Sequence, residues 1–240
     1  MTTERHIIIH EGPGGPFESM AVYDPAAGTQ PGLLLFPNFL GTKEWDFAKA
    51  EELASLGFKV LVVDVYGQGK RASGMGDPKA GEYMHELTED RAAMRDRLTD
   101  ALGVLQSLPG VDTTRTGAIG FCLGGKCVLD LARSGADIAL GVSFHGVYDA
   151  PPFPNAEIKA KLLICHGWND PLCPPEATVA LAQELTASKA DWQLIAYSDT
   201  GHAFTANDVP LNDDHSFGFQ PATNDRSWKA MQAMLTEVFG

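Results

Sequence analysis

The stretch Thr116-Gly-Ala-Ile-Gly-Phe-Cys-Leu-Gly-Gly-Lys126 decides how this chain is interpreted. Its first half is an apolar run that predicts a strand, and the segment Leu123–Arg133 after it predicts a helix. Between them lies Cys122 in a Gly-x-Cys-x-Gly-Gly frame, whose glycines leave room for a strand and a helix to cross closely. This pattern is typical of a nucleophile elbow. The sequence therefore predicts a cysteine nucleophile at a helix N-terminus, where backbone N–H groups and the helix dipole favour a thiolate.

Composition limits the classes of protein to which the chain can belong. Its 240 residues fit one large α/β domain, and we expect a single domain over residues 1–240. The net charge of −13 argues against binding to a nucleic-acid backbone, which depends on Lys and Arg. The sequence shows neither a basic N-terminal region followed by an apolar core nor an apolar run of about 20 residues. We therefore expect no secretion signal and no membrane span.

The four cysteines lie in apolar strand or helix contexts and do not form the spaced framework of a disulfide-rich protein; they are Cys122, Cys127, Cys165 and Cys173. With no export signal, this predicts reduced thiols and a cytoplasmic location. CxxC and HExxH motifs are absent, so we expect no structural zinc site. The chemistry that the motifs indicate requires no metal or organic cofactor.

Short apolar runs alternate with helical patterns along the whole chain. We expect strands at 6–10, 19–23, 32–36, 59–65, 117–121, 139–144, 162–166 and 192–198. We expect helices at 42–56, 89–108, 123–133, 175–188 and 225–239, the first ending at Gly57 in a left-handed conformation. The central strands are continuous apolar runs, as in a sheet buried on both faces. The alternation predicts a doubly wound, mostly parallel α/β sheet whose ligands bind beyond the carboxyl ends of the strands.

Two downstream segments supply partners for the cysteine. A thiolate nucleophile needs a base, and the base needs an acceptor that orients it. Asp170 follows the apolar strand in Leu162-Leu-Ile-Cys-His-Gly-Trp-Asn-Asp-Pro171, and His202 follows the last strand on a glycine-containing loop. The order of nucleophile, acid and histidine is that of the α/β-hydrolases. Asp149 is the alternative acid, and Asp170 could instead form a turn before Pro171.

Three motifs together resemble the dienelactone hydrolase family of α/β-hydrolases: Gly120-Phe-Cys-Leu-Gly-Gly125, His166-Gly-Trp-Asn-Asp-Pro171 and Gly201-His-Ala-Phe204. The resemblance covers essentially the whole chain. It implies an α/β-hydrolase fold and a triad of Cys122, Asp170 and His202. It implies hydrolysis of a small carboxylic ester or lactone through an acyl-enzyme, with an oxyanion hole formed by the backbone N–H groups of Leu123 and Phe39.

Two positions depart from the family pattern. Asn38 stands where the family has a glutamate that contacts the resting cysteine, and Ala206 stands where it has an arginine that holds the substrate carboxylate. Arg71 and Arg91 are the candidates for the family's other arginine. Without a bidentate cationic clamp, a carboxylated lactone loses its most specific contact, so the resemblance leaves the substrate open. We expect Asn38, Tyr66, His145 and Phe204 to line the substrate pocket.

Several alternatives stay open at this point. Cys122 could be a buried apolar side chain, and the protein could be a thioesterase or acyl transferase, or a non-catalytic ligand-binding or redox-sensing relative. We expect a small-molecule substrate, no nucleic-acid or membrane partner, and a monomer or small homo-oligomer. Residues 67–72 superficially mimic a dinucleotide fingerprint, but we expect 73–78 not to open the helix that such a site needs. Residues 205–223 could cover the substrate or only connect elements at the surface.

Overall fold

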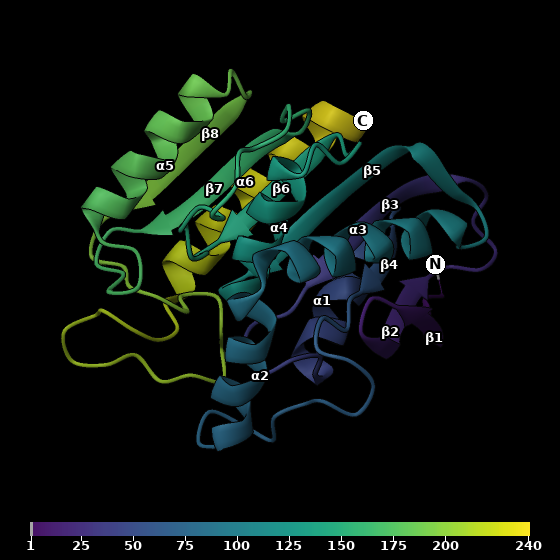
Figure 1. The fold of residues 1–240 in the computed structure, drawn as a ribbon, viewed down its shortest axis with the longest axis horizontal. Helices are drawn as coiled ribbons and strands as arrows, with labels where there is room; N and C mark the ends of the chain where they lie inside the picture. The colour runs from purple at the N-terminus through teal and green to yellow at the C-terminus, as the bar shows by residue number, and fades with distance from the viewer. Residues whose placement is uncertain (1) are drawn as a thin grey trace. The chain divides into compact units, whose positions relative to one another are not determined.

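All eight predicted strands are present in residues 2–240, which are the residues that the structure, a computed structural model, describes. The strand order is β1-β2-β4-β3-β5-β6-β7-β8 (Figure 1). The chain divides into two compact units, Met1–Ile119 and Gly120–Gly240, and the boundary falls inside β5 (Val111–Phe121). The predicted α/β class with a mostly parallel sheet is confirmed. The single domain over residues 1–240 stays a prediction.

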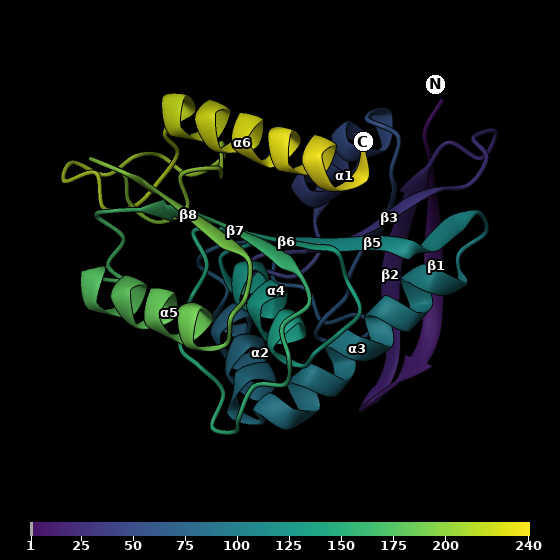
Figure 2. The same ribbon diagram turned by 90° about the horizontal axis from the view of Figure 1, so that it is seen from above.

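The first unit combines an antiparallel hairpin with parallel strands. Its elements are β1 (Glu4–Gly12), β2 (Gly15–Tyr23), β3 (Gln30–Phe36), α1 (Glu44–Ser55), β4 (Lys59–Val62), α2 (Pro78–Glu89), α3 (Arg91–Ser107) and most of β5. Strand β2 is antiparallel to β1 and β4, whereas β3 and β4 are parallel. Helix α1 covers one face of these strands and α3 the other (Figure 2). Gly57 ends α1 with φ 97°, as predicted.

Helix α2 is the element that the sequence analysis missed. Residues 73–76 form turns and bends, so no helix follows the glycines of 67–72 directly, but a helix that we did not expect starts at Pro78. The Asp77 carboxylate caps it by accepting the N–H of Lys79 (3.0 Å), and Pro78 occupies the first turn. Asp90 then caps α3 by accepting two backbone N–H groups. The apolar residues of α2 stand at helical spacing, a periodicity that the sequence analysis passed over; they are Ala80, Tyr83, Met84 and Leu87, of which Ala80 and Leu87 are buried.

The second unit holds the end of β5 and the remaining parallel strands. Its elements are α4 (Leu123–Arg133), β6 (Leu140–Phe144), β7 (Lys161–Gly167), α5 (Pro175–Ala187), β8 (Trp192–Tyr197) and α6 (Pro221–Phe239). Strands β6, β7 and β8 are parallel, with α4 and α5 on one face and α6 on the other (Figure 2). Across residues 2–240, none of the helices is both long and apolar enough to cross a membrane.

Candidate active site

Cys122 lies on a sharp turn between β5 and α4. Its φ of 56° and ψ of −115° are values that residues with a side chain rarely adopt. The N–H of Cys122 donates to the carbonyl of Phe144 at the end of β6 (3.0 Å), and its carbonyl accepts the N–H of Gly125 (2.9 Å). The side chain is partly exposed, whereas the other three cysteines are buried. The elbow geometry that the sequence predicts is present.

The start of α4 crosses β5 at very short range. A Cβ atom placed on Gly120 would lie 2.0 Å from the carbonyl oxygen of Gly124, so only glycine fits there. Leu123 is the first residue of α4. The first N–H groups of a helix have no intrahelical acceptor, which is consistent with the expected place of Leu123 in an oxyanion hole; that role stays a prediction.

Asp170 and His202 are in direct contact. The Nδ1 atom of His202 lies 2.7 Å from Oδ2 of Asp170, and both residues are 2% exposed. The other carboxylate oxygen of Asp170 accepts the N–H of Leu172 (2.8 Å). Asp170 therefore forms both the turn around Pro171 and the contact with His202, which the sequence analysis gave as alternatives. The hydrogen bond in the turn helps to orient its carboxylate.

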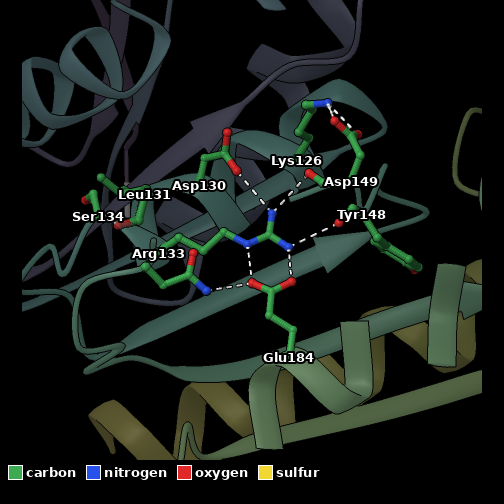
Figure 3. A network of polar contacts seen from close by, with 9 residues as sticks. Lys126, Asp130, Leu131, Arg133, Ser134, Tyr148, Asp149 and Glu184 are labelled. Atoms are coloured by element: carbon green, nitrogen blue, oxygen red, sulfur yellow. Dashed lines mark hydrogen bonds and ion pairs between the residues drawn. The ribbon is translucent and has the colours of Figure 1, made fainter. Parts of the chain in front are cut away.

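The alternative acid, Asp149, has a different partner. Its carboxylate accepts two hydrogen bonds from the Nζ atom of Lys126 in α4, at 2.5 and 2.6 Å. Nearby, the buried guanidinium of Arg133 binds Glu184 of α5 through two nitrogens (2.8 and 2.7 Å) and donates to the carbonyl of Tyr148 (3.1 Å; Figure 3). These contacts hold the segment after β6 between α4 and α5. Of the two candidate acids, Asp170 is the one that contacts His202.

Residues 205–220 fold back on His202, a feature that the sequence analysis did not predict. The N–H of His202 donates to the carbonyl of Ser216 (2.8 Å), and its carbonyl accepts the N–H of Gly218 (2.9 Å). The ring of Phe217 stacks on the imidazole with centroids 5.7 Å apart. A Cβ atom on Gly201 would lie only 1.9 Å from the carbonyl oxygen of Ser216. The segment thus fixes both the backbone and the ring of His202.

A second buried histidine lies edge-on to His202. The ring centroids of His145 and His202 are 5.0 Å apart at an angle of 68°. Nε2 of His145 is 2.8 Å from the hydroxyl of Thr205, and Phe204, which is fully buried, packs edge-on against the same ring. Thr205 and Phe217 carried no sequence signal, because only the folded segment brings them to the histidines.

The two histidines have opposite electrostatic tendencies. Burial lowers the pKa of His202, but the negative charge on Cys122 and the hydrogen bond with Asp170 outweigh it and raise the pKa to about 10. Nε2 of His202 is buried, and no hydrogen-bond partner within residues 2–240 meets the usual distance and angle limits for this atom. Cys122 is nevertheless close enough to raise the pKa of His202. Burial and the charge on His202 hold the pKa of His145 well below its usual value. A proton is therefore favoured on His202 and disfavoured on His145.

The remaining histidine and thiols near the site have structural environments. Both ring nitrogens of His166 have partners, the hydroxyls of Tyr148 and Thr178, each at 3.1 Å. Burial raises the pKa of Cys165 and of Cys173 to about 12, which disfavours their thiolates. In the part of the chain that the structure describes, no cluster of three or more His, Cys, Asp or Glu side chains is arranged to hold a metal ion.

Several predicted site residues lie in the first unit. The amide oxygen of Asn38 accepts the N–H of Leu40 (3.0 Å), and the hydroxyl of Tyr66 donates to the carbonyl of Phe39 (2.9 Å). Arg71 binds Glu18 and the hydroxyl of Thr42. The roles of Phe39 in an oxyanion hole and of Asn38 and Tyr66 in a substrate pocket stay predictions, as do those of His145 and Phe204.

A cysteine on a strand-turn-helix elbow, followed by an acid after β7 and a histidine after β8, places the protein among the α/β-hydrolases. The sequence model of the dienelactone hydrolase family matches residues 17–239. The chain therefore belongs to the dienelactone hydrolase family and is an enzyme of the carboxylic ester hydrolase class.

Individual relatives agree with this assignment. The solved structure of m3DLH is 33% identical and superposes over 100% of both chains with a TM-score of 0.92. A dienelactone hydrolase-like promiscuous phosphotriesterase from metagenomic libraries is 30% identical, also over 100% of both chains, with a TM-score of 0.89. A Bradyrhizobium protein named as a probable 2-oxo-3-(5-oxofuran-2-ylidene)propanoate lactonase is 25% identical over 187 residues, 74% of each chain.

Proposed function

We propose that this enzyme hydrolyses small carboxylic esters or lactones with Cys122 as nucleophile, His202 as acid and base, and Asp170 as the orienting carboxylate. The observation that carries the proposal is the buried contact of 2.7 Å between Asp170 and His202, together with the coupling of the His202 charge to Cys122. The contact presents Nε2 of His202 for proton transfer, since Nδ1 is occupied by the carboxylate. The elbow leaves the thiol partly exposed for attack.

In the proposed first half-reaction, the proton resides on His202 and Cys122 attacks as a thiolate. The carbonyl carbon of the substrate forms a bond to Sγ, and the N–H groups of Leu123 and Phe39 stabilise the oxyanion. Each N–H group lowers the activation barrier by about 3 kcal/mol. The carbon–oxygen bond of the ester then breaks, and the leaving alkoxide takes the proton from Nε2 of His202. The product of this step is a thioester on Cys122 and an alcohol, which stays tethered when the substrate is a lactone.

In the second half-reaction, water completes the cycle. Neutral His202 removes a proton from the water as it attacks the thioester carbonyl, and the sulfur leaves as a thiolate. The carboxylic acid product departs, and the ion pair of Cys122 and His202 is restored. Asp170 stays ionised throughout, because its role is to orient the ring and to stabilise its positive charge.

We propose that the substrate does not depend on a carboxylate clamp. Ala206 stands where the family has an arginine that holds the substrate carboxylate, so the bidentate contact that this arginine would make is lost. The lactonase name of the Bradyrhizobium relative supports lactones as one substrate group to test. Short, uncharged esters and lactones are therefore the substrates we expect.

A p-nitrophenyl ester series of increasing chain length tests the proposal, with and without iodoacetamide. We expect turnover that alkylation of Cys122 abolishes. Cys122→Ala should eliminate turnover while the circular dichroism spectrum stays that of the wild type, and Cys122→Ser should give a weaker enzyme. Full activity of Cys122→Ala would disprove the mechanism. Reversible oxidation of Cys122 without any turnover of esters or lactones would favour the redox-sensing alternative.

A second activity is suggested by the phosphotriesterase relative, which is 30% identical over the full length of both chains. A thiolate that attacks a carbonyl carbon can also attack the phosphorus of an uncharged triester and expel a phenolate. Release of p-nitrophenol from a diethyl p-nitrophenyl phosphotriester, lost in Cys122→Ala, would establish this activity at the same site.

The cytoplasmic location also stays a proposal. It is supported by the four cysteines, none of which forms a disulfide within residues 2–240.

A further inference from the structure

Strand β1 forms one end of the strand order, so one of its two edges is open. Ile7 and Ile9 on this strand are 62% and 60% exposed, more than any other large hydrophobic side chain in the described residues. The middle of the strand, His6-Ile-Ile-Ile-His10, contains no Pro, Lys, Asp or Glu. Proteins usually protect an exposed edge with such residues or with a bulge, so this edge is suited to pairing with another strand.

The hairpin geometry shows which backbone groups face the open edge. Gly12 pairs with Gly15 across a two-residue turn, and the pair that closes such a turn is hydrogen-bonded. Even-numbered residues of β1 therefore direct their N–H and C=O groups toward β2, and odd-numbered residues direct theirs outward. Ile7 and Ile9 thus combine exposed side chains with outward-facing backbone groups.

The side chains of β1 alternate between two environments. Arg5 binds Glu44 and Glu51 of α1, whereas His10 lies 3.3 Å from Asp100 of α3. The odd-numbered residues therefore share the face that carries α1. Along this face the order is cationic, apolar, apolar and anionic: Arg5, Ile7, Ile9 and Glu11.

We propose that β1 pairs with β1 of a second copy of this chain, antiparallel and about a two-fold axis at Ile8. In this register Ile7 lies opposite Ile9 of the partner subunit, and Arg5 lies opposite Glu11 of the partner subunit. All nine residues of the strand are paired, and the four outward-facing residues each exchange two hydrogen bonds with the residue opposite. A two-fold interface requires a self-complementary surface, and this strand has one.

The other registers that keep the outward-facing groups paired are less favourable. Moving the axis to Ile7 places Arg5 opposite Ile9 of the partner subunit, and moving it to Ile9 places Glu11 opposite Ile7 of the partner subunit. Each shift removes the pairing of opposite charges and leaves a charged group against an apolar one. The sequence of the strand therefore favours one register for pairing with a second copy.

The oligomeric state tests the interface. Sedimentation velocity of the wild-type chain should show a dimer, and Ile9→Lys should raise the dissociation constant at least tenfold while preserving the circular dichroism spectrum. Val179→Lys is the matched control, because Val179 is also about half exposed (51%) but lies on α5. A monomeric wild type at micromolar concentrations, or an Ile9→Lys variant that dimerises like the wild type, would overturn the proposal.

Cysteine cross-linking tests the register. In a Cys122→Ser background, the Ile7→Cys, Ile8→Cys and Ile9→Cys variants are oxidised separately, and the other native cysteines are buried. In the proposed register Ile8 lies opposite Ile8 of the partner subunit in a non-hydrogen-bonded pair. The Cα atoms of such a pair are about 4.5 Å apart, within the range for a disulfide. We expect a cross-linked dimer with Ile8→Cys alone. Cross-linking at position 7 or 9 instead would refute this register, and no cross-linking at any of the three positions would refute the β1 interface.

Discussion

At the scale of single residues, the assignment of the acid depends on two aspartates with different partners. Asp170 contacts Nδ1 of His202, whereas Asp149 is bound by Lys126. We expect Asp170→Asn to lower kcat about 10⁴-fold, because the amide stabilises the wrong tautomer and cannot balance the charge of the imidazolium. Asp149→Asn should leave kcat close to that of the wild type and cost about 1 kcal/mol of stability. Ester kinetics of both variants test this, and the reverse ranking would reassign the acid to Asp149.

The pKa of His202 gives a second prediction at this scale. Since Cys122 and Asp170 raise this pKa to about 10, the proton should stay on His202 as the pH rises from 6.5 to 9. The rate of Cys122 alkylation by iodoacetamide should then change little over this range. Above about pH 10 the imidazolium loses its proton, and ester hydrolysis should fall because the leaving group has no acid.

The control for this prediction is His202→Asn. Without the imidazolium, alkylation of Cys122 should rise about tenfold per pH unit until the ordinary pKa of a thiol, about 8.5. The same pH profile in the wild type and the variant would show that His202 does not hold the proton for Cys122.

At the scale of elements, the segment 205–220 has a positioning role. Ser216 and Gly218 of this segment hydrogen-bond to the backbone N–H and carbonyl of His202, and Gly201 lets the two segments approach closely. Gly201→Ala would force them apart, so we expect a loss of about 1–3 kcal/mol in stability and about 100-fold in kcat/KM. Thermal unfolding and ester kinetics measure both effects.

Gly103→Ala is the matched control for this prediction. Gly103 lies in α3, and a Cβ atom there would have no neighbour within 4 Å. We expect this variant to gain about 1 kcal/mol from helix propensity with unchanged kinetics. If Gly201→Ala behaved in the same way, the segment would not be needed to position His202.

At the scale of the whole molecule, the question is whether residues 1–240 unfold as one domain. Strand β5 runs through the boundary at Ile119, so the two units share a continuous strand. We expect one calorimetric transition whose calorimetric and van't Hoff enthalpies agree. Two resolved transitions, or a calorimetric enthalpy well above the van't Hoff value, would contradict the single domain.

The sequence by itself determined the features whose signals are local. Short apolar runs predicted every strand, and the frame around Cys122 predicted the elbow because only glycine permits a crossing as close as that at Gly120. The order of Cys122, Asp170 and His202 was also readable, since each residue follows the end of a strand. The family assignment followed from those same motifs.

Only the tertiary structure decided the features that depend on contacts between distant segments. The partner of each aspartate was undecided until the fold brought Asp170 to His202 and Lys126 to Asp149. The stacking of Phe217 on His202 gave no signal in the sequence, because it depends on a contact between separate segments and not on a repeating apolar pattern. The open edge of β1 likewise became visible only when the strand order showed that, within residues 2–240, one side of this strand has no neighbouring strand.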